Sequence, residues 1–200
     1  MFTRRRKIIS RGQTVYLFEP SPAGIDDFLA MTAASLAFHQ PWVFPATTPR
    51  RFRAYLDRLE GGGAVGYFIG RAADDAMVGV VNINDIIMGG LRTGSLGYYV
   101  GAEFARRGYM REGLSLVLDQ AFDALELNRL EANVQPGNAA SLGLITRLGF
   151  RKEGFSPKYL QIDGIWRDHE RWAILATEWR AQRELRRAAA AAPLRRGVLA

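Results

Sequence analysis

The sequence predicts an α/β fold, a mixed sheet of about seven strands flanked by about four helices. Three observations predict it. Residues 65–100 contain three consecutive strand-like runs. From Met110 onward the apolar residues recur at helical spacing, and residues 129–134 alternate again. Residues 94–134 therefore form a strand, a helix and a strand, whose two strands pair in parallel through a right-handed connection.

The elements before residue 65 are one strand and two helices. Residues 13–18 form a strand that stops at a pair of prolines. Residues 26–38 form the first helix. The second begins with Thr48 as its N-cap and Pro49 at its first position, and it ends at the glycines of residues 61–63.

The middle of the chain is an antiparallel meander. Its strands cover residues 65–69, 77–87 and 94–100, and turn-forming Asp and Gly pairs separate them. The helix after it has its apolar stripe at positions 110, 114, 117, 118, 121, 122 and 125.

The last third holds a short helix and a hairpin. Asn138 caps the helix, and Gly149 stands where a C-terminal glycine belongs. Two strands, 155–162 and 165–175, flank an Asp-Gly turn.

The net charge of +7 is concentrated at the two ends of the chain. Residues 1–11 form a basic tail of charge +5, and residues 179–200 form a basic, Ala-rich tail that is helix-prone from Arg180 to Ala192 but poor in apolar anchors. We expect a single domain at residues 12–178. The tails either only solvate the chain or steer it toward an anionic partner such as the ribosome.

Composition excludes several classes of protein. No apolar stretch approaches the roughly 18 residues of a membrane span, and no signal peptide pattern follows the N-terminus. The absence of cysteine excludes disulfides, thiolate metal sites and a cysteine nucleophile. Neither histidine has partners that suggest a metal site, so we expect no metal. Together with the missing membrane span, signal peptide pattern and cysteines, this predicts a cytoplasmic protein without a membrane partner.

A basic loop, residues 105–111, opens the helix that follows the meander. The first N–H groups of a helix lack partners and carry partial positive charge, which a pyrophosphate satisfies. Gly108 lets phosphate oxygens approach the backbone, and Arg106, Arg107 and Arg111 supply charge. The alternative is that these arginines are solvated residues before an ordinary helix.

Asn138 begins the helix after the next strand. The carboxyl ends of two parallel strands lie at the same edge of a sheet, so one ligand can touch both the basic loop and Asn138. A purely structural cap is the alternative.

These motifs resemble the GCN5-related N-acetyltransferase superfamily. The resemblance covers residues 12–178 and rests on the Arg-Arg-Gly-Tyr-Met-Arg-Glu-Gly loop at 106–113, Asn-Ala-Ala-Ser at 138–141 and Leu-Gly-Phe at 148–150. Residues 158–169 are similar to the closing hairpin of the RimJ/RimL branch, the ribosomal-protein alanine N-acetyltransferases. Leu-Gly-Tyr-Tyr-Val at 96–100 and Pro41-Trp42 are also similar to that branch.

The resemblance implies the GNAT-type acyl-CoA N-acyltransferase fold, with acetyl-CoA as cosubstrate. It implies that Tyr98, Tyr99 and Val100 pair with the pantetheine arm and that Asn138 hydrogen-bonds this arm. It also implies that the pyrophosphate is bound by Arg106, Arg107, Gly108, Tyr109, Met110 and Arg111. Two positions depart from the superfamily pattern, Ala105 in place of Gln or Arg and Met110 in place of Gly or Ala.

The catalytic acid and base are less clearly marked. Many members of the superfamily use a tyrosine as the acid, where this chain has Ile145. Ser141, one turn after Asn138, is the candidate acid, and packing against the sheet is its alternative role. Many relatives have Glu as the base where this chain has Ser95. Glu103 is therefore the candidate base, and Tyr99, also nearby in sequence, is the alternative. A backbone N–H near Val100 is expected to stabilise the oxyanion.

The acceptor is expected to be an α-amine rather than a lysine, because an α-amine titrates near 7.7–8.0 and needs less help from a base. Trp42, with Phe38 and His39, and Trp166 and Asp168, with His169, are the candidate acceptor residues. Asp168 would attract the ammonium, and core or lid packing is the alternative for the tryptophans.

The leading hypothesis is direct acetyl transfer to the N-terminal alanine of a ribosomal protein. The alternatives are a small-amine acetyltransferase, for an antibiotic or polyamine, and a ribosome-binding assembly factor that keeps the fold. Monomer and dimer both remain open.

Overall fold

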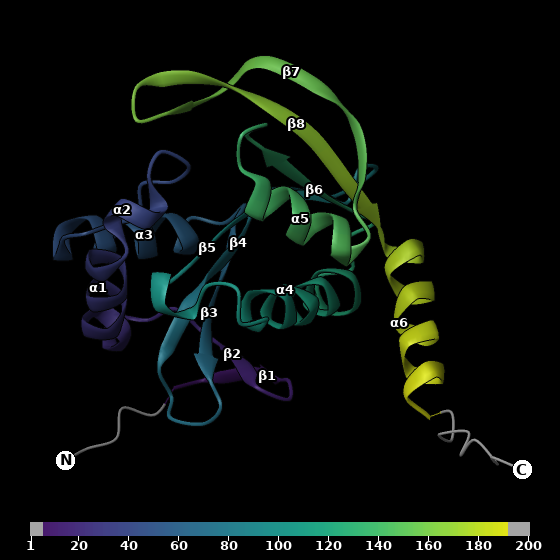
Figure 1. The fold of residues 1–200 in the computed structure, drawn as a ribbon, viewed down its shortest axis with the longest axis horizontal. Helices are drawn as coiled ribbons and strands as arrows, with labels where there is room; N and C mark the ends of the chain where they lie inside the picture. The colour runs from purple at the N-terminus through teal and green to yellow at the C-terminus, as the bar shows by residue number, and fades with distance from the viewer. Residues whose placement is uncertain (1–5, 192–200) are drawn as a thin grey trace, which may run out of the picture.

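The computed structural model describes residues 6–191, which form one mixed sheet with helices on both faces (Figure 1). The strand order is β1-β2-β3-β4-β5-β6-β8-β7. The strands are β1 (Ile8–Arg11), β2 (Val15–Phe18), β3 (Val65–Arg71), β4 (Met77–Ile87), β5 (Thr93–Val100), β6 (Arg129–Val134), β7 (Arg151–Ile162) and β8 (Ile165–Leu175). Only β5 and β6 pair in parallel in the described sheet.

The helices divide between the two faces. They are α1 (Ile25–Ala34), α2 (Leu36–His39), α3 (Pro49–Glu60), α4 (Tyr109–Asp119), α5 (Ala139–Leu148) and α6 (Ala176–Ala191), with a π-helical turn at Gln120–Ala124 after α4. One apolar core packs α4 and α5 against the sheet, and a second, rich in phenylalanine, packs α1 and α3 against the opposite face. Successive side chains of a strand point to opposite faces of the sheet, so one strand contributes to both cores. In β3, Ile69 packs in the first core and Phe68 in the second.

The predicted helix ends have the expected caps. The Thr48 hydroxyl accepts a hydrogen bond from the N–H of Arg51 at 3.3 Å, and Pro49 occupies the first position of α3. Gly149 ends α5 with a φ of 91°, a conformation that disfavours a side chain. These ends were predictable because each depends on residues within one turn.

The mixed α/β fold is confirmed, with two corrections near the N-terminus. The predicted helix at 26–38 is broken at Ser35, whose hydroxyl accepts a hydrogen bond from the N–H of Ala102 at 2.9 Å. Residues 8–11, assigned to the basic tail from their charge, form the edge strand β1 and pair with β2.

The C-terminal boundary also differs from the expected one. Residues up to 191 form α6, and Trp179 at its start is only 1% exposed. The indole N–H of Trp179 donates to Asp119 at 2.8 Å. Arg180 and Arg183 form ion pairs with Asp123 of the π-helical turn. The start of α6 is therefore anchored. Residues 192–200, like residues 1–5, lie outside the described part.

The β7–β8 hairpin is long and arches away from the rest of the sheet (Figure 1). Its base pairs with β6 through Glu170–Leu175, and its outer half continues past the end of β6. No helix in the described residues is long and apolar enough to cross a membrane.

Candidate active site

The site begins where the two parallel strands separate. Cα partners join β5 to β6 from Thr93 with Arg129 to Leu96 with Ala132. Both strands then continue, to Val100 and Val134, without a further register pair in the described sheet. A cavity of about 1630 Å³ occupies this region and is lined by residues from both faces of the sheet.

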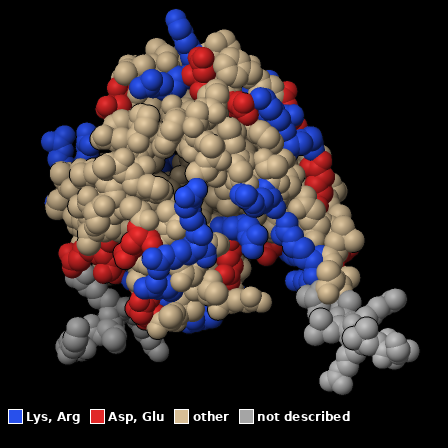
Figure 2. Space-filling model, viewed as in Figure 1, with Lys and Arg blue, Asp and Glu red and all other residues tan. Residues whose placement is uncertain are grey.

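The basic loop lies at the mouth of this cavity. Gly108 is the N-cap of α4 with a φ of 86°, and no side chain caps the helix. A Cβ at Gly108 would meet no atom within 4 Å, so the space beside this residue is open. Arg106, Arg107 and Arg111 are exposed and line the cavity. Figure 2 shows a hollow on this face with basic side chains beside it.

This arrangement fits a pyrophosphate. The helix N-terminus lacks a side-chain acceptor, and an anion there gains both its N–H groups and the partial positive charge of the helix. Of the predicted loop residues, Met110 also lines the cavity, whereas Tyr109 does not. Its ring packs edge-on against Phe104, so only its backbone is available to a ligand.

Helix α5 supplies the second wall. The Asn138 side-chain oxygen accepts a hydrogen bond from the N–H of Ser141 at 3.1 Å, which is an N-cap. Asn138 also lines the cavity, so capping occupies its oxygen while its amide N–H groups are the part left to a ligand.

Ser141 has a partner that the sequence did not reveal. The hydroxyls of Ser141 and Tyr98 lie 2.5 Å apart, and both residues line the cavity. Burial raises the pKa of Tyr98 to about 12, so its hydroxyl keeps its proton at neutral pH. The two hydroxyls form a proton-bearing pair on the side of α5.

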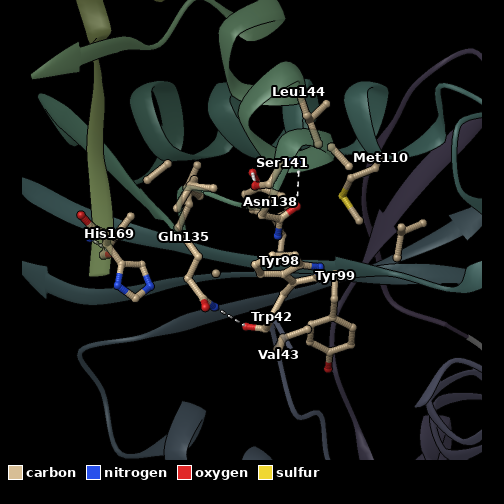
Figure 3. A pocket seen from close by; sticks show the side chains of 18 of the residues that line it. Trp42, Val43, Tyr98, Tyr99, Met110, Gln135, Asn138, Ser141, Leu144 and His169 are labelled. Carbon is tan, nitrogen blue, oxygen red and sulfur yellow. Dashed lines mark hydrogen bonds between the residues drawn. The ribbon is translucent and has the colours of Figure 1, made fainter. Parts of the chain in front are cut away.

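Tyr99 faces the opposite way from its neighbour. Its ring packs edge-on against His39 at 5.3 Å, on the face of α1 and α3, and Figure 3 shows it pointing away from Ser141 and Asn138. Burial raises the pKa of Tyr99 well above its ordinary value. Tyr99 therefore offers its backbone, not its ring, to a ligand on the α5 side.

The end of β5 is held by a buried histidine. The His39 Nε2–H donates to the carbonyl of Val100 at 2.9 Å, and burial lowers the pKa of His39. Gly101 N–H donates to Val78 on β4, and successive N–H groups of a strand point to opposite edges. The Val100 N–H therefore points toward the gap between β5 and β6, where an oxyanion donor is expected.

Polar side chains from β4, β5 and β6 form the opposite side of the cavity. Because Leu130, Ala132 and Val134 are buried in the core with α5, the alternate residues of β6 face the other way. Among these are Glu131 and Asn133, and Gln135 follows directly after the strand; all three line the cavity. Asn133 Nδ2 lies 3.4 Å from Ser95 Oγ, and Gln135 donates to the carbonyl of Trp42 at 3.3 Å (Figure 3).

Sequence reasoning missed this polar wall although its signal was present. The alternation of residues 129–134 predicts the apolar side of this strand in the core, and the same pattern identifies its polar side. The hairpin residues Tyr159, Leu160 and Ile162, which also line the cavity, had no such signal.

The predicted acceptor residues divide between the lining of the cavity and positions outside it. Phe38, His39, Trp42 and His169 line the cavity. Trp166 does not, and its side chain is 57% exposed on the outer hairpin.

Two predicted roles need correction. Asp168 lies outside the cavity lining, and its carboxylate accepts a hydrogen bond from the N–H of Lys158 at 2.8 Å. Glu103, the candidate base, is exposed in a 3₁₀ turn and also lies outside the lining. Sequence proximity to Val100 suggested Glu103, but proximity along the chain does not fix the direction of a side chain, and the lining resumes only at Phe104.

Comparisons with known proteins agree with this geometry. Residues 15–151 match the profile of the acetyltransferase (GNAT) domain family. The probable N-acetyltransferase YjcK of Bacillus subtilis strain 168 is 39% identical over 126 residues, which are 63% of this chain and 70% of YjcK.

Two further relatives carry substrate or ligand names. The ribosomal protein uS5-alanine N-acetyltransferase of Escherichia coli K12 is 36% identical over 103 residues, which are 52% of this chain and 53% of that enzyme. The matched segment thus spans about half of the Escherichia coli enzyme. The structure of Mycobacterium smegmatis RimJ in complex with CoA-disulfide has a TM-score of 0.77 and 28% identity, covering 88% of this chain and 89% of RimJ.

Proposed function

The chain belongs to the GNAT acetyltransferase family and is an acetyl-CoA-dependent N-acetyltransferase, and from this premise we propose that its acceptor is a protein N-terminus. The acceptor proposed first is the N-terminal alanine of a ribosomal protein. The named activity of the Escherichia coli relative supports this choice.

The observation that carries the proposal is the composition of the cavity on the side away from α5. Amide side chains (Asn84, Asn133, Gln135) and apolar or aromatic ones make up most of it, and the acids in the lining are Asp85 and Glu131. One basic side chain, Arg58, is also in this part of the lining and donates to the Asn84 side-chain oxygen at 2.8 Å. Arg129 donates to Glu131 at 2.9 Å, so this carboxylate is already paired. Amides suit the hydrogen-bonding groups of a peptide, whereas a polyamine carries several positive charges and needs several free acids.

Each side of the gap has its own role in the proposed reaction. Acetyl-CoA supplies the acetyl thioester that the amine attacks. Arg106, Arg107 and the N–H groups that open α4 hold the pyrophosphate, and the Asn138 amide N–H groups bind the arm. The Val100 N–H, fixed through its carbonyl by His39, stabilises the charge that develops on the acetyl oxygen.

Ser141 passes its hydroxyl proton to the departing sulfur and takes up in exchange the proton that the amine loses on acylation, and Tyr98 orients that hydroxyl. A dedicated strong base is not required for an α-amine of pKa about 7.7–8.0, of which about a third is neutral at pH 7.5. Since Glu103 lies outside the cavity, we assign it no role.

The test compares three acceptors. The purified chain is incubated with acetyl-CoA and one acceptor at a time, and thiol release is measured. The acceptors are a peptide that begins with Ala, the same peptide with a blocked N-terminus and an internal lysine, and spermidine. We expect release only with the free N-terminus. Preferred turnover of spermidine would support the small-amine alternative, and absence of turnover with all three would leave no support for the assigned acceptor.

A further inference from the structure

The outer part of β7 contains a bulge that faces Asp168. Ser156 pairs with His169 and Leu160 pairs with Arg167, so β7 uses two more residues than β8 between these pairs. Pro157 has no N–H to give to a ladder. Lys158 has a φ of 48°, a region that a residue with a Cβ rarely adopts. The bulge is therefore a conformation that needs an interaction to hold it.

Asp168 supplies this interaction. Its Oδ1 accepts the hydrogen bond from the Lys158 N–H at 2.8 Å, across the hairpin. The carboxylate thus has a backbone partner. Because Asp168 is outside the cavity lining, it has no position from which to contact an amine in the cavity.

The residue after Lys158 is the one that the bulge presents to the cavity. The Tyr159 ring lies edge-on against His169, with 6.1 Å between centroids, and both residues line the cavity with Leu160. His169 is itself fixed, because it is buried and its Nδ1 lies 2.9 Å from the carbonyl of Arg167. Tyr159 remains 39% exposed, which leaves part of its ring available to a ligand.

Building on the proposed protein acceptor, we propose that Tyr159 binds the first residues of the acceptor peptide and that Asp168 is a positioning residue for it. Asp168 acts by holding the bulge through the Lys158 N–H. Tyr159 lies on the hairpin, and the phosphate-binding loop lies at the N-terminus of α4. The two residues therefore affect the acceptor and not acetyl-CoA.

The matched variants Asp168→Asn and Asp168→Ala separate a bulge clamp from a charge that attracts the amine. Asparagine keeps an oxygen that accepts from Lys158 N–H, whereas alanine does not. We expect Asp168→Asn to keep the KM for an Ala-starting peptide within about twofold and Asp168→Ala to raise it about 5- to 10-fold, the loss typical of one interface contact.

Tyr159→Ala is expected to raise the peptide KM by a similar factor with the KM for acetyl-CoA unchanged. Phe155→Ala, an exposed aromatic on the same strand outside the cavity lining, is the control and should leave both values unchanged. An unchanged peptide KM in Tyr159→Ala would overturn the assignment of Tyr159. An equal rise in Asp168→Asn and Asp168→Ala would overturn the clamp in favour of the charge.

Amide hydrogen exchange at Lys158, measured by NMR, tests the clamp without any acceptor. Exchange should stay slow in the wild type and in Asp168→Asn and become fast in Asp168→Ala. Equal exchange in all three would overturn the clamp. If the wild-type chain turned over no peptide, the proposed acceptor would fail while this exchange result would still decide whether the bulge is held by Asp168.

Discussion

Two adjacent tyrosines, Tyr98 and Tyr99, lie on opposite faces of the sheet at this site. Strand alternation sends Tyr98 to Ser141 on α5 and Tyr99 to His39 on the opposite face. The family resemblance implied that both pair with the pantetheine arm. The sequence motif identifies the strand, but it does not show which helices cover each of its faces. The hydroxyl pair on the α5 side is the consequence that can be tested first.

Ser141→Ala should lower kcat about 10- to 100-fold and change the KM for acetyl-CoA little, because a proton donor acts mainly in the transition state. Tyr98→Phe should have a smaller effect, about 3- to 10-fold on kcat, since Ser141 keeps its own proton. Steady-state kinetics with a peptide acceptor measure both. Unchanged kcat in Ser141→Ala would assign the helix-packing role to this residue.

The two histidines make stability depend on pH. Burial lowers the pKa of both His39 and His169 below 6.5. As pH falls below 6.5 the unfolded chain takes up protons that the folded chain resists, so the free energy of unfolding should decrease as pH falls toward the folded pKa values. Each histidine contributes a slope of at most about 1.4 kcal/mol per pH unit.

Urea unfolding at several values between pH 5 and pH 7.5 measures this slope. The carboxylates with lowered pKa values, Asp74, Asp123 and Glu153, titrate at lower pH, so they do not account for a slope in this range. In the double variant His39→Gln and His169→Gln, the free energy of unfolding should depend less steeply on pH, whatever the absolute stability of the variant. The same slope in the double variant would point to other groups.

At the scale of elements, the sequence predicted what depends on neighbouring residues. The caps at Thr48, Asn138 and Gly149 and the Asp-Gly turn of the hairpin are local, and the structure has each of them. The anchoring of α6 depends on partners far along the chain. The strand at residues 8–11 pairs with the very next strand, but its position in a basic segment indicated a tail instead. The bulge at Lys158 is also nonlocal, because its partner Asp168 lies across the hairpin.

Asn138 combines a helix cap with a proposed cofactor contact, and two variants distinguish these roles. Asn138→Ala should lose about 0.5–2 kcal/mol of stability through the cap and also weaken acetyl-CoA binding. Asn138→Asp keeps the capping oxygen but removes the amide N–H groups, so it should retain stability and raise the KM for acetyl-CoA. An unchanged KM in Asn138→Asp would leave only the cap.

Trp179 anchors α6 to the rest of the chain. Trp179→Ala should lower the free energy of unfolding by about 3–5 kcal/mol, the usual cost of emptying a buried aromatic site. Leu185→Ala, on the same helix but 71% exposed, should change it by no more than about 0.5 kcal/mol. Chemical denaturation compares the two. Equal effects would contradict the assignment of Trp179 as the anchor.

At the scale of the whole molecule, part of the basic charge at the two ends is already used within the fold. Arg6 pairs with Asp27 and Lys7 with Glu19, while Arg183 pairs with Asp119 and Asp123. These pairs join Arg6 to α1, Lys7 to the residue after β2, and α6 to the end of α4 and the turn that follows it. Attraction of an anionic partner therefore depends on the arginines beyond them.

Four such arginines, Arg4, Arg5, Arg195 and Arg196, lie at 1–5 and 192–200, segments without an acidic residue. Removing both segments lowers the net charge from +7 to +3. If they steer the chain to the ribosome, the truncated chain should cosediment with ribosomes less, and salt should weaken its binding less than that of the full chain. Its kcat/KM for a short peptide should stay the same, because the peptide lacks the ribosome's charge. Equal cosedimentation of both chains over a range of salt would show instead that these segments only solvate the protein.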